Sequence, residues 1–490
     1  MATLRKTALA TLGVREPKTV EISGAIQTAH IDGTFHIWRQ GEKERFDENL
    51  GVRRETTLRV GDREYIRSAT GQVRQLHGLL VERQKTADFI GSDEFLRSPQ
   101  YATVVGNEQL PAARNVTHIR VSPPGGQAED VYVDAKDGMI DRVAFDDVDG
   151  ITTIDYSDYK TIGGVLVAMK EVTSNGDHEY DLVQTATRVK IDKALENSVF
   201  DVPASSTVAV NGSVTVPIEE RNGHLFTQVS VHGKSLRFLI DTGAQGVVLD
   251  GKVALQLGLM PEGRLQVTGA QRTGGLGMAP LDAVQIGGAT LPTGIVSVLD
   301  LSEQNTGLEN VDGILGFPFF ASADVKIDPN RLTMTIAKPG GLVKDGTPIP
   351  VDIDRELVEI EGKINGIEGR FVIDTGNSIE LLVFRPFLDR HNGLVPMNNA
   401  GFAPNYGVGG SARAMTSIVD ELDFGSYRLY NRYANVMLAT SGAFADRFDA
   451  GNIGYATLRN FVITYDIANG TIYAQRSSTF DDGRYRPRPQ

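Results

Sequence analysis

The sequence predicts a mainly β protein in which an N-terminal antiparallel unit is followed by two related copies of a second β unit. Two observations lead to this fold class. Most of the 490-residue chain consists of short alternating runs broken by Gly, Asn and Asp, the pattern of strands and turns. The tripeptide Asp-Thr-Gly occurs twice, at residues 241–243 and 374–376, each time after an apolar run. At roughly 100–200 residues per domain, the length predicts two to four domains.

Only three short segments fit a helix better than a strand. They are residues 6–14, 251–258 and 385–391. The N-terminal domain is predicted to span residues 1–203, where consecutive strand candidates joined by tight turns favour an antiparallel sheet curling round an interior. The other predicted boundaries are a linker at 204–213, a first lobe at 214–345, a second lobe at 346–480 and a polar tail at 481–490.

Composition argues against several classes of function. The formal charge of −13, without a basic stripe, gives no support for nucleic-acid binding. The absence of cysteine excludes a disulfide framework, a thiol nucleophile and cysteine-ligated metal. Eight scattered His residues without an H-E-x-x-H pattern argue against a zinc hydrolase, so we expect no metal and no cofactor.

The sequence contains no membrane-spanning pattern. No run approaches the roughly 18 apolar residues that a transmembrane helix needs. The first 20 residues carry two early basic residues but no apolar core after them, so they do not match an intact secretory signal.

The C-terminal half repeats itself with an offset of 133 residues (374 − 241). A Gly-containing turn ends eight residues before each repeated Asp, at Gly233 and Gly366. Downstream, the four-residue motif 313–316 follows the first Asp by 72 residues (313 − 241), and the motif 451–454 follows the second by 77 (451 − 374). A strand pair comes next in both copies. Four landmarks in the same order indicate an internal duplication.

The repeated aspartates point to acid–base chemistry. A lone carboxylate at the end of a buried strand is costly, so two such groups suggest a paired site in which they face each other. Two carboxylates that close share one proton. The ionised member can then take a proton from water while the protonated member donates one to a carbonyl oxygen. Hydrolysis of a peptide bond is the reaction that this pairing suits.

This duplicated unit, with Asp-Thr-Gly after an apolar strand and a Gly-x-x-Gly motif downstream, resembles the aspartic proteases. The likeness is to the retropepsin-like families, with both lobes on one chain as in the pepsins, and it covers residues from about 214 to 475. It implies a bilobal pair of acid-protease β-barrels beside the N-terminal half-barrel. It also implies Asp241 and Asp374 as the catalytic residues, a peptide or protein substrate, and activity in a monomer.

The same resemblance implies supporting roles for the residues around the two aspartates. The threonines of the two motifs would hydrogen-bond across the loops, and their glycines would permit turns closed to other residues. The downstream glycines would pack beneath the loops. These supporting residues are Thr242, Gly243, Thr375, Gly376, Gly313, Gly316, Gly451 and Gly454.

Two glycine-rich stretches lie where this family places the hairpins, or flaps, that close over the substrate. Glycines there would permit tight turns and movement. The residues are Thr268, Gly269, Gly274 and Gly275 in the first lobe and Tyr406, Gly407, Val408, Gly409 and Gly410 in the second.

The two lobes differ from each other. Ala244 and Asn377 occupy the third position after each Asp, where pepsin-like enzymes usually carry a hydroxyl, so we expect an activity optimum less acidic than that of gastric enzymes. Asn452 stands where the family usually has an apolar residue, which weakens the expected packing in lobe two. The acidic stretch 352–356 has no role in this mechanism and is expected to be solvated surface.

The N-terminal strands, with the segments 156–172 and 197–203, are similar to the lipoprotein-carrier fold of the bacterial periplasm. That fold is a half-open β-barrel closed by helices. The similarity implies that the domain could hold a lipid or a lipidated ligand, and that the protein is exported to the bacterial periplasm or cell surface; a cytoplasmic location stays open. Two further alternatives are a non-catalytic peptide- or lipid-binding envelope protein and a zymogen in which residues 1–203 are inhibitory.

Overall fold

The computed structural model describes residues 16–111, 114–148, 150–270, 272–301, 310–397 and 401–485. The helix predicted at residues 6–14 therefore lies outside the described residues, as does the end of the predicted tail. Within the described ranges, no helix has both the length and the apolar character needed to cross a membrane.

The chain divides into two compact units. The first comprises residues 1–68 and 75–203, and the second comprises residues 69–74 and 204–490. The grouping of the short segment 69–74 with the second unit was not predicted.

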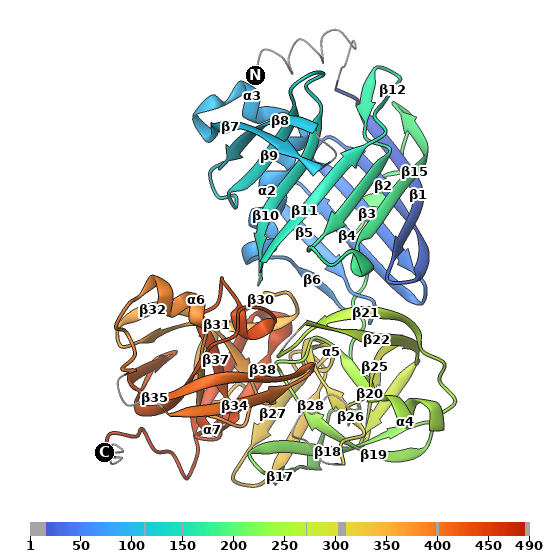
Figure 1. Ribbon diagram of the computed structural model, residues 1–490. Coiled ribbons are helices and arrows are strands. Elements are labelled where there is room, and N and C mark those ends of the chain that lie inside the picture. Colours follow the sequence, from blue (N-terminus) through green and yellow to red (C-terminus); the bar gives the residue numbers. More distant parts are fainter. Residues whose placement is uncertain are drawn as a thin grey trace. The chain divides into compact units, whose positions relative to one another are not determined.

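The first unit is built on one antiparallel sheet of 13 strands, in the order β6-β5-β4-β3-β2-β1-β15-β14-β11-β10-β9-β8-β7 (Figure 1). Most neighbours in this order are also neighbours in the chain, as expected from strands joined by tight turns. The strands are β1 (Thr19–Thr28), β2 (Ile31–Gln40), β3 (Lys43–Leu50), β4 (Arg53–Val60), β5 (Arg63–Arg67), β6 (Val73–Gln75), β7 (Ala102–Leu110), β8 (Arg114–Val121), β9 (Glu129–Asp134), β10 (Ile140–Asp147), β11 (Gly150–Ser157), β14 (Lys170–Ser174) and β15 (Leu182–Ile191), with a separate hairpin of β12 (Lys160–Ile162) and β13 (Val165–Val167).

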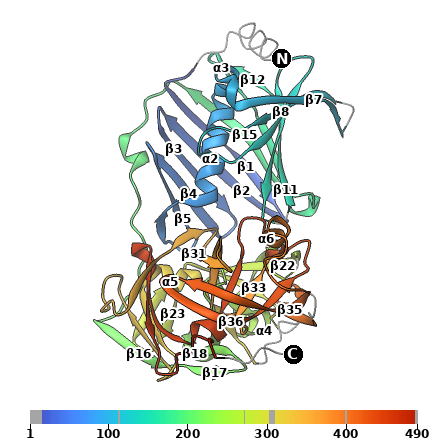
Figure 2. The same ribbon diagram turned by 90° about the vertical axis from the view of Figure 1, so that its left-hand side faces the viewer.

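Helix α2 (Gly78–Gly91) lies across one face of this sheet, as Figure 2 shows, and α3 (Glu94–Arg97) follows it. Leu79 and Ile90 are buried, while Arg83 pairs with Asp147 of β10 at 2.9 Å. Helix α2 was not predicted, because its apolar residues lie at the two ends of the helix and form no continuous stripe. Its middle is polar and is held by hydrogen bonds and ion pairs to the sheet.

Lobe one of the second unit contains a ten-stranded sheet whose main path is β21-β22-β25-β20-β26-β19-β18-β23-β24, with β17 paired to β18. Helix α4 is two residues shorter than predicted. The elements are β16 (Ser213–Pro217), β17 (Glu219–Arg221), β18 (His224–Val231), β19 (Lys234–Ile240), β20 (Val247–Asp250), α4 (Gly251–Gln256), β21 (Glu262–Thr268), β22 (Arg272–Pro280), β23 (Ala283–Ile286), β24 (Ala289–Pro292), β25 (Ile295–Leu299), β26 (Gly313–Leu315), α5 (Phe317–Ser322), β27 (Asp324–Asp328) and β28 (Thr333–Ala337).

Lobe two repeats this plan in an eight-stranded sheet, β30-β31-β32-β37-β33-β36-β35-β34. In lobe one, β19 pairs in parallel with β26, and in lobe two β32 pairs in parallel with β37. The elements are β29 (Thr347–Pro350), β30 (Asp352–Asp354), β31 (Leu357–Ile364), β32 (Ile367–Asp374), β33 (Leu381–Val383), α6 (Arg385–Arg390), β34 (Phe402–Gly407), β35 (Gly410–Phe424), β36 (Tyr427–Met437), β37 (Gly451–Gly454), α7 (Tyr455–Leu458), β38 (Phe461–Asp466) and β39 (Thr471–Arg476), with short 3-10 turns at η5 (Ala443–Ala445) and η6 (Ile467–Asn469).

A third sheet joins the two lobes of this unit (Figure 1). Its order is β16-β28-β27-β38-β39-β29, so three strands come from each lobe and the central pair is β27 with β38. One continuous apolar core includes buried residues of both lobes, among them Phe320 of lobe one and Tyr465 of lobe two, whose rings meet edge to face. The predicted linker also joins this core, since Val208 is fully buried.

The predicted fold class is confirmed: the protein is mainly β, with several large sheets and few helices. The duplicated pairing pattern of the lobes has a sequence cause. Each apolar run ending in Asp forms a strand buried in the middle of its sheet, which is where continuous runs of Val, Ile, Leu and Phe are favoured.

Candidate active site

Each repeated Asp lies where a buried strand gives way to a loop. Asp241 directly follows β19, and Asp374 is the last residue of β32. Both side chains are half-buried, so solvent can reach them. The parallel neighbours β26 and β37 carry the two Gly-x-x-Gly motifs, so the sheet itself brings each downstream motif beside its Asp.

The two Asp-Thr-Gly loops interlock through their threonines. The Thr242 backbone N–H donates to Thr375 Oγ1 at 3.0 Å, and the Thr375 N–H donates to Thr242 Oγ1 at the same distance. Each hydroxyl then donates to a carbonyl of the opposite lobe, at Ile373 (2.6 Å) and Ile240 (2.9 Å). Both threonines are buried, so these four bonds act in an environment that strengthens them. They hold the two loops in one relative position.

The glycines of the motifs leave room for the opposite carboxyl group. A β-carbon on Gly243 would lie 2.5 Å from Asp374 Cγ, and one on Gly376 would lie 2.3 Å from Asp241 Cγ. Real β-carbons do not approach other atoms so closely, so any other residue would displace a carboxyl group. Because each carboxyl group touches the other loop, the two aspartates face each other.

The environment of Asp241 favours its protonated form. Burial raises the pKa of Asp241 well above its ordinary value, and the neighbouring Asp374, through its charge and a hydrogen bond, raises it further. Hydrogen bonds from the Gly243 and Ala244 backbone N–H groups act in the opposite direction but do not compensate.

Asp374 receives an additional donor that Asp241 lacks. Its Oδ1 accepts from the backbone N–H groups of Gly376 (2.8 Å) and Asn377 (3.0 Å). Its Oδ2 accepts from the Asn452 side-chain amide, which in turn accepts from Asn377 Nδ2 at 2.9 Å. Ile314 holds the position of Asn452 in lobe one and has no polar group. Asn452 was expected to weaken the packing of lobe two, whereas its side chain donates to the Asp374 carboxylate.

The downstream glycines support the loops by close approach. A β-carbon on Gly316 would lie 2.4 Å from the Ala244 carbonyl, and one on Gly454 would lie 2.8 Å from the Asn377 carbonyl. These same carbonyls accept hydrogen bonds from the residues that follow each glycine, at 2.8 Å and 2.7 Å. Gly313 and Gly451, three residues earlier in each motif, pack against Val248 and Leu382. Six of the eight predicted supporting residues therefore lie in or against the two loops, while Gly313 and Gly451 contact neighbouring strands of their sheets.

The two predicted flaps are hairpins whose tips touch. The first is formed by β21 and β22 and the second by β34 and β35. The Ala270 N–H at the first tip donates to the Val408 carbonyl at the second, at 2.7 Å. The first tip is also held by lobe two, because the Gly269 carbonyl accepts from the Ala443 N–H at 2.8 Å.

The second tip reaches back to lobe one. Val408 packs against the same apolar cluster as Ala244, which includes Phe226 and Leu239. The hairpins are thus closed on each other. One detail differs from the prediction: Thr268 and Gly269 lie at the first tip, whereas Gly274 and Gly275 lie farther along β22.

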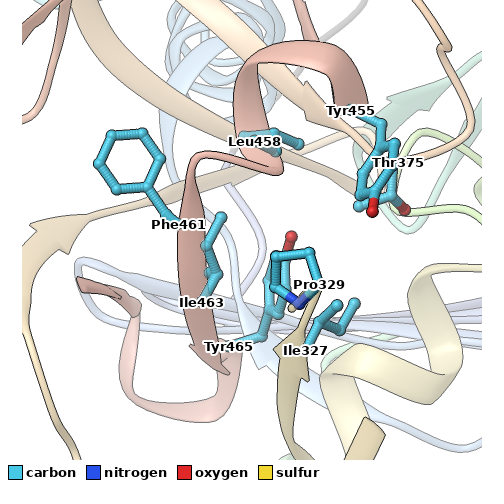
Figure 3. A pocket seen from close by; sticks show the side chains of 8 residues that line it. All are labelled: Ile327, Pro329, Thr375, Tyr455, Leu458, Phe461, Ile463 and Tyr465. Atoms are coloured by element: carbon cyan, nitrogen blue, oxygen red, sulfur yellow. The ribbon is translucent and has the colours of Figure 1, made fainter. Parts of the chain in front are cut away.

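A small apolar cavity has Thr375 of the second Asp-Thr-Gly loop in its wall, together with side chains that include Tyr455 and Tyr465 (Figure 3). Its volume of about 10 Å³ holds at most one water molecule. Burial, and to a lesser extent the Asp374 charge, raises the pKa of Tyr465 in its wall, so that phenol stays neutral. The cavity is a packing gap under the site and is too small for a ligand.

His224 lies at the site and could not be predicted from the sequence. It begins β18, and its ring is hydrogen-bonded to the Gly376 backbone. Burial lowers its pKa, which keeps the ring neutral near pH 7, and its Nδ1 has no hydrogen-bond partner among the described residues. A single His in an alternating strand is not distinguishable by sequence from a core residue.

The acidic stretch 352–356 is solvated only in part: Asp352 is exposed as predicted, but the prediction was wrong for Asp354 and Arg355. Asp354 is fully buried, and Arg355 beside it is 12% exposed. Arg355 also contacts Glu359 (3.5 Å), Asp446 (2.7 Å) and Asp449 (3.0 Å). A run of charges looked like surface because its partners lie almost 100 residues away in the chain. The Arg355 carbonyl accepts from Gln245 at 2.5 Å, which links this buried cluster to the loop after Asp241.

Comparisons with known proteins agree with this site in part. A family model described as aspartyl protease matches residues 227–319, which include Asp241 and the motif 313–316 of lobe one. The chain therefore contains an aspartyl-protease-like region; the match does not extend to lobe two. A search of curated proteins finds no match.

Solved structures give only distant likenesses. Basic 7S globulin from soybean is 12% identical, with a TM-score of 0.34 over 56% of this chain and 99% of that one. A LolA superfamily protein from Nitrosomonas europaea is 15% identical, with a TM-score of 0.30 over 40% of this chain and 97% of that one. A DUF1329 family protein from Desulfovibrio piger is 14% identical, with a TM-score of 0.29 over 41% and 96%. TM-scores below 0.5 carry no functional argument.

Proposed function

We propose that this protein is an aspartic endopeptidase in which Asp241 and Asp374 activate one water molecule for attack on a peptide bond. The observation that carries the proposal is the interlocking of the two loops, which sets each carboxyl group against the glycine of the other loop. Two carboxyl groups held this way share a proton, so one can act as base and the other as acid.

The two carboxyl groups accept hydrogen bonds from different donors, and this difference suggests which Asp is the base and which is the acid. Asn452 adds a hydrogen bond that stabilises negative charge on Asp374, and burial keeps the proton on Asp241. Asp374 then accepts a proton from the water as its oxygen attacks the carbonyl carbon, while Asp241 gives its proton to the carbonyl oxygen. In the second step Asp374 passes its proton to the leaving nitrogen, the C–N bond breaks, and a hydroxyl proton returns to Asp241. The dyad ends as it began.

The first test is peptide cleavage by the full chain. The protein is incubated with an unfolded protein substrate across pH 3–8, with and without a peptidomimetic that carries a hydroxyl in place of the scissile bond. We expect cleavage that the inhibitor blocks, because the inhibitor imitates the tetrahedral intermediate. The raised pKa of Asp241 and the lack of a hydroxyl at Ala244 predict an optimum above about pH 3.5. Absence of cleavage at every pH would contradict the proposal and favour a non-catalytic peptide- or lipid-binding protein.

Asn452 is expected to set the acidic limb of the pH profile. The substitution Asn452→Ile introduces the side chain found at the equivalent position of lobe one, Ile314. It removes the hydrogen bond that the Asn452 amide donates to the ionised Asp374 carboxylate. A hydrogen bond to a charged group contributes roughly 1.5–3 kcal/mol, and one pH unit corresponds to about 1.4 kcal/mol. We expect the acidic limb of kcat/KM to move up by about one pH unit or more.

The matched control is Ile314→Val in lobe one, which changes packing at the equivalent position without removing a donor. The acidic limb of kcat/KM for Ile314→Val should lie at the wild-type pH, even if this variant is less stable than the wild type. A profile for Asn452→Ile that keeps the wild-type limb, with only a lower kcat, would show that Asn452 serves packing alone.

Export to a bacterial periplasm or cell surface belongs to the same proposal and rests on the sequence. The role of the first unit as an inhibitory segment is likewise a proposal. Comparing the full chain with a chain that begins near residue 204 would test it, because an inhibitory unit predicts higher activity after its removal.

A further inference from the structure

The first unit contains a polar cavity that the proposed protease function does not use. The cavity has a volume of about 160 Å³, enough for roughly five water molecules at about 30 Å³ each. It lies between strands β3–β5 and helix α2. Its lining residues are Glu44, Phe46, Thr57, Arg59, Glu64 and Gln84.

Glu64 is the unusual member of this lining. It is only 8% exposed, and within the described part of the chain its carboxylate has no hydrogen bond or ion pair. The other charged groups here are paired. Arg59 bridges Glu44 (3.1 Å) and Asp88, and Asp88 also accepts from Gln84 (3.0 Å). A buried carboxylate without a partner is costly to ionise, which singles out Glu64 as a group prepared for a ligand.

The charges around Glu64 are not balanced. Three elements pack against it and present Arg59 from β4, Asp88 from α2 and Glu44 from β3. Arg39 of β2 also pairs with Glu44, at 2.8 Å, so three carboxylates face two guanidinium groups when all five are ionised. The surplus is negative, and a bound cation would compensate for it.

We propose that this cavity binds a small organic cation, with a primary ammonium or guanidinium group donating its N–H bonds to the Glu64 carboxylate. Phe46 supplies an aromatic wall, and such rings attract cations through their faces. The volume limits the ligand to a small molecule or to the end of a longer one.

Three other occupants fit the cavity less well. An anion would meet the surplus of carboxylates. A lipid chain would find one aromatic ring and would leave Glu64 buried without a partner. A metal ion needs converging ligands, and the described residues contain no group of three or more His, Asp or Glu side chains arranged to hold one.

The proposal carries a pH dependence. Burial, the largest cause, together with the nearby Asp88 and Glu44 charges, raises the pKa of Glu64 to about 7, while Arg59 acts against this rise. Only the ionised form accepts a cation, so binding displaces a proton. The ionised fraction rises about tenfold between pH 6 and pH 8 when the pKa is about 7, and the apparent affinity should rise by about the same factor.

The test is calorimetric titration of the full chain with methylguanidinium and with butylammonium at pH 6 and pH 8. We expect both cations to bind about tenfold more tightly at pH 8. Glu64→Gln, which keeps the size of the side chain, should weaken binding at least tenfold and remove the pH dependence. Glu42→Gln, an exposed position in the turn before β3, is the matched control and should bind as the wild type does.

Several outcomes would overturn the proposal. They are absence of binding by the wild type, equal binding by Glu64→Gln, or tighter binding of acetate or phosphatidylcholine vesicles than of either cation. If Glu64→Gln does not fold, Phe46→Leu takes its place, because it keeps the carboxylate and removes the aromatic wall. Unchanged cation binding by Phe46→Leu would then count against this cavity as the site. None of these results depends on proteolytic activity.

Discussion

Asp241→Asn and Asp374→Asn are each expected to abolish peptide cleavage while leaving the fold intact. Asn has nearly the shape of Asp, so the backbone N–H groups around each loop keep their partners. It can neither accept the proton of the attacking water nor deliver one to the carbonyl oxygen. Acid–base groups of this kind contribute roughly 10²–10⁴-fold each to rate, and we expect kcat/KM to fall by at least that amount. The measurement is cleavage of a fluorogenic peptide, with circular dichroism to monitor the fold.

The double variant provides a sharper test of the pair. Groups that act as a unit are not additive, so Asp241→Asn combined with Asp374→Asn should be hardly worse than either change alone. Asp389→Asn, at an exposed ion pair on α6, is the control and should retain full activity. Substantial activity in either single variant would refute the dyad.

Arg355→Met is expected to destabilise the second unit by about 3–5 kcal/mol, the usual cost of removing one partner from a buried ion pair. The change leaves Asp354, Glu359, Asp446 and Asp449 buried, with Arg370 as the remaining cation within reach of two of them. Chemical denaturation at pH 8 measures the effect. Arg428→Met removes an exposed ion pair on β36 and should cost at most about 1 kcal/mol. If Arg355→Met lowers the free energy of unfolding by no more than Arg428→Met does, the buried cluster is not stabilised by its ion pairs.

The same cluster gives the stability of the protein a defined pH dependence. Burial is the largest cause that raises the pKa of Glu359 to about 9 and that of Asp449 to about 7. Since these values lie above those of the unfolded chain, the folded form binds the protons more tightly. The stability gained is fully present below about pH 4 and is lost as pH rises towards 9. Glu359→Gln should reduce the loss of stability between about pH 4 and pH 9. Arg355→Met should lower the free energy of unfolding less at pH 5 than at pH 8.

Much of the fold followed from local patterns. The alternating runs predicted strands, and the repeated landmarks predicted two lobes, because period and turn residues are local properties of the sequence. The pairing of β27 with β38 could not be predicted from local patterns, because nothing in the sequence of either strand identifies a partner strand in the other lobe. Helix α2 was missed for a related reason: its polar middle is stabilised by the sheet beneath it and not by its own pattern.

Some residues of the candidate site could likewise be predicted from the sequence, and others could not. The two aspartates, their threonines and their glycines carry a motif that can be read directly. The hydrogen bond from Asn452 to Asp374 could not be predicted. A polar residue at a usually apolar position shows that the local contacts differ, but it does not show which group the residue contacts. The burial of Asp354 could not be predicted because charged stretches are usually exposed. Its partner Arg355 also pairs with Asp446 and Asp449, which lie far away in the sequence.

The sheet shared by the lobes has a consequence for synthesis on the ribosome. Val325 of β27 pairs with Tyr465 of β38, a separation of 140 residues (465 − 325), so this sheet cannot close until β38 of lobe two has emerged. Contacts between such distant residues also form slowly. A nascent chain that has completed only lobe one holds a single Asp-Thr-Gly loop without its counterpart. The order of translation thereby delays the pairing of the two carboxylates until lobe two has been synthesised.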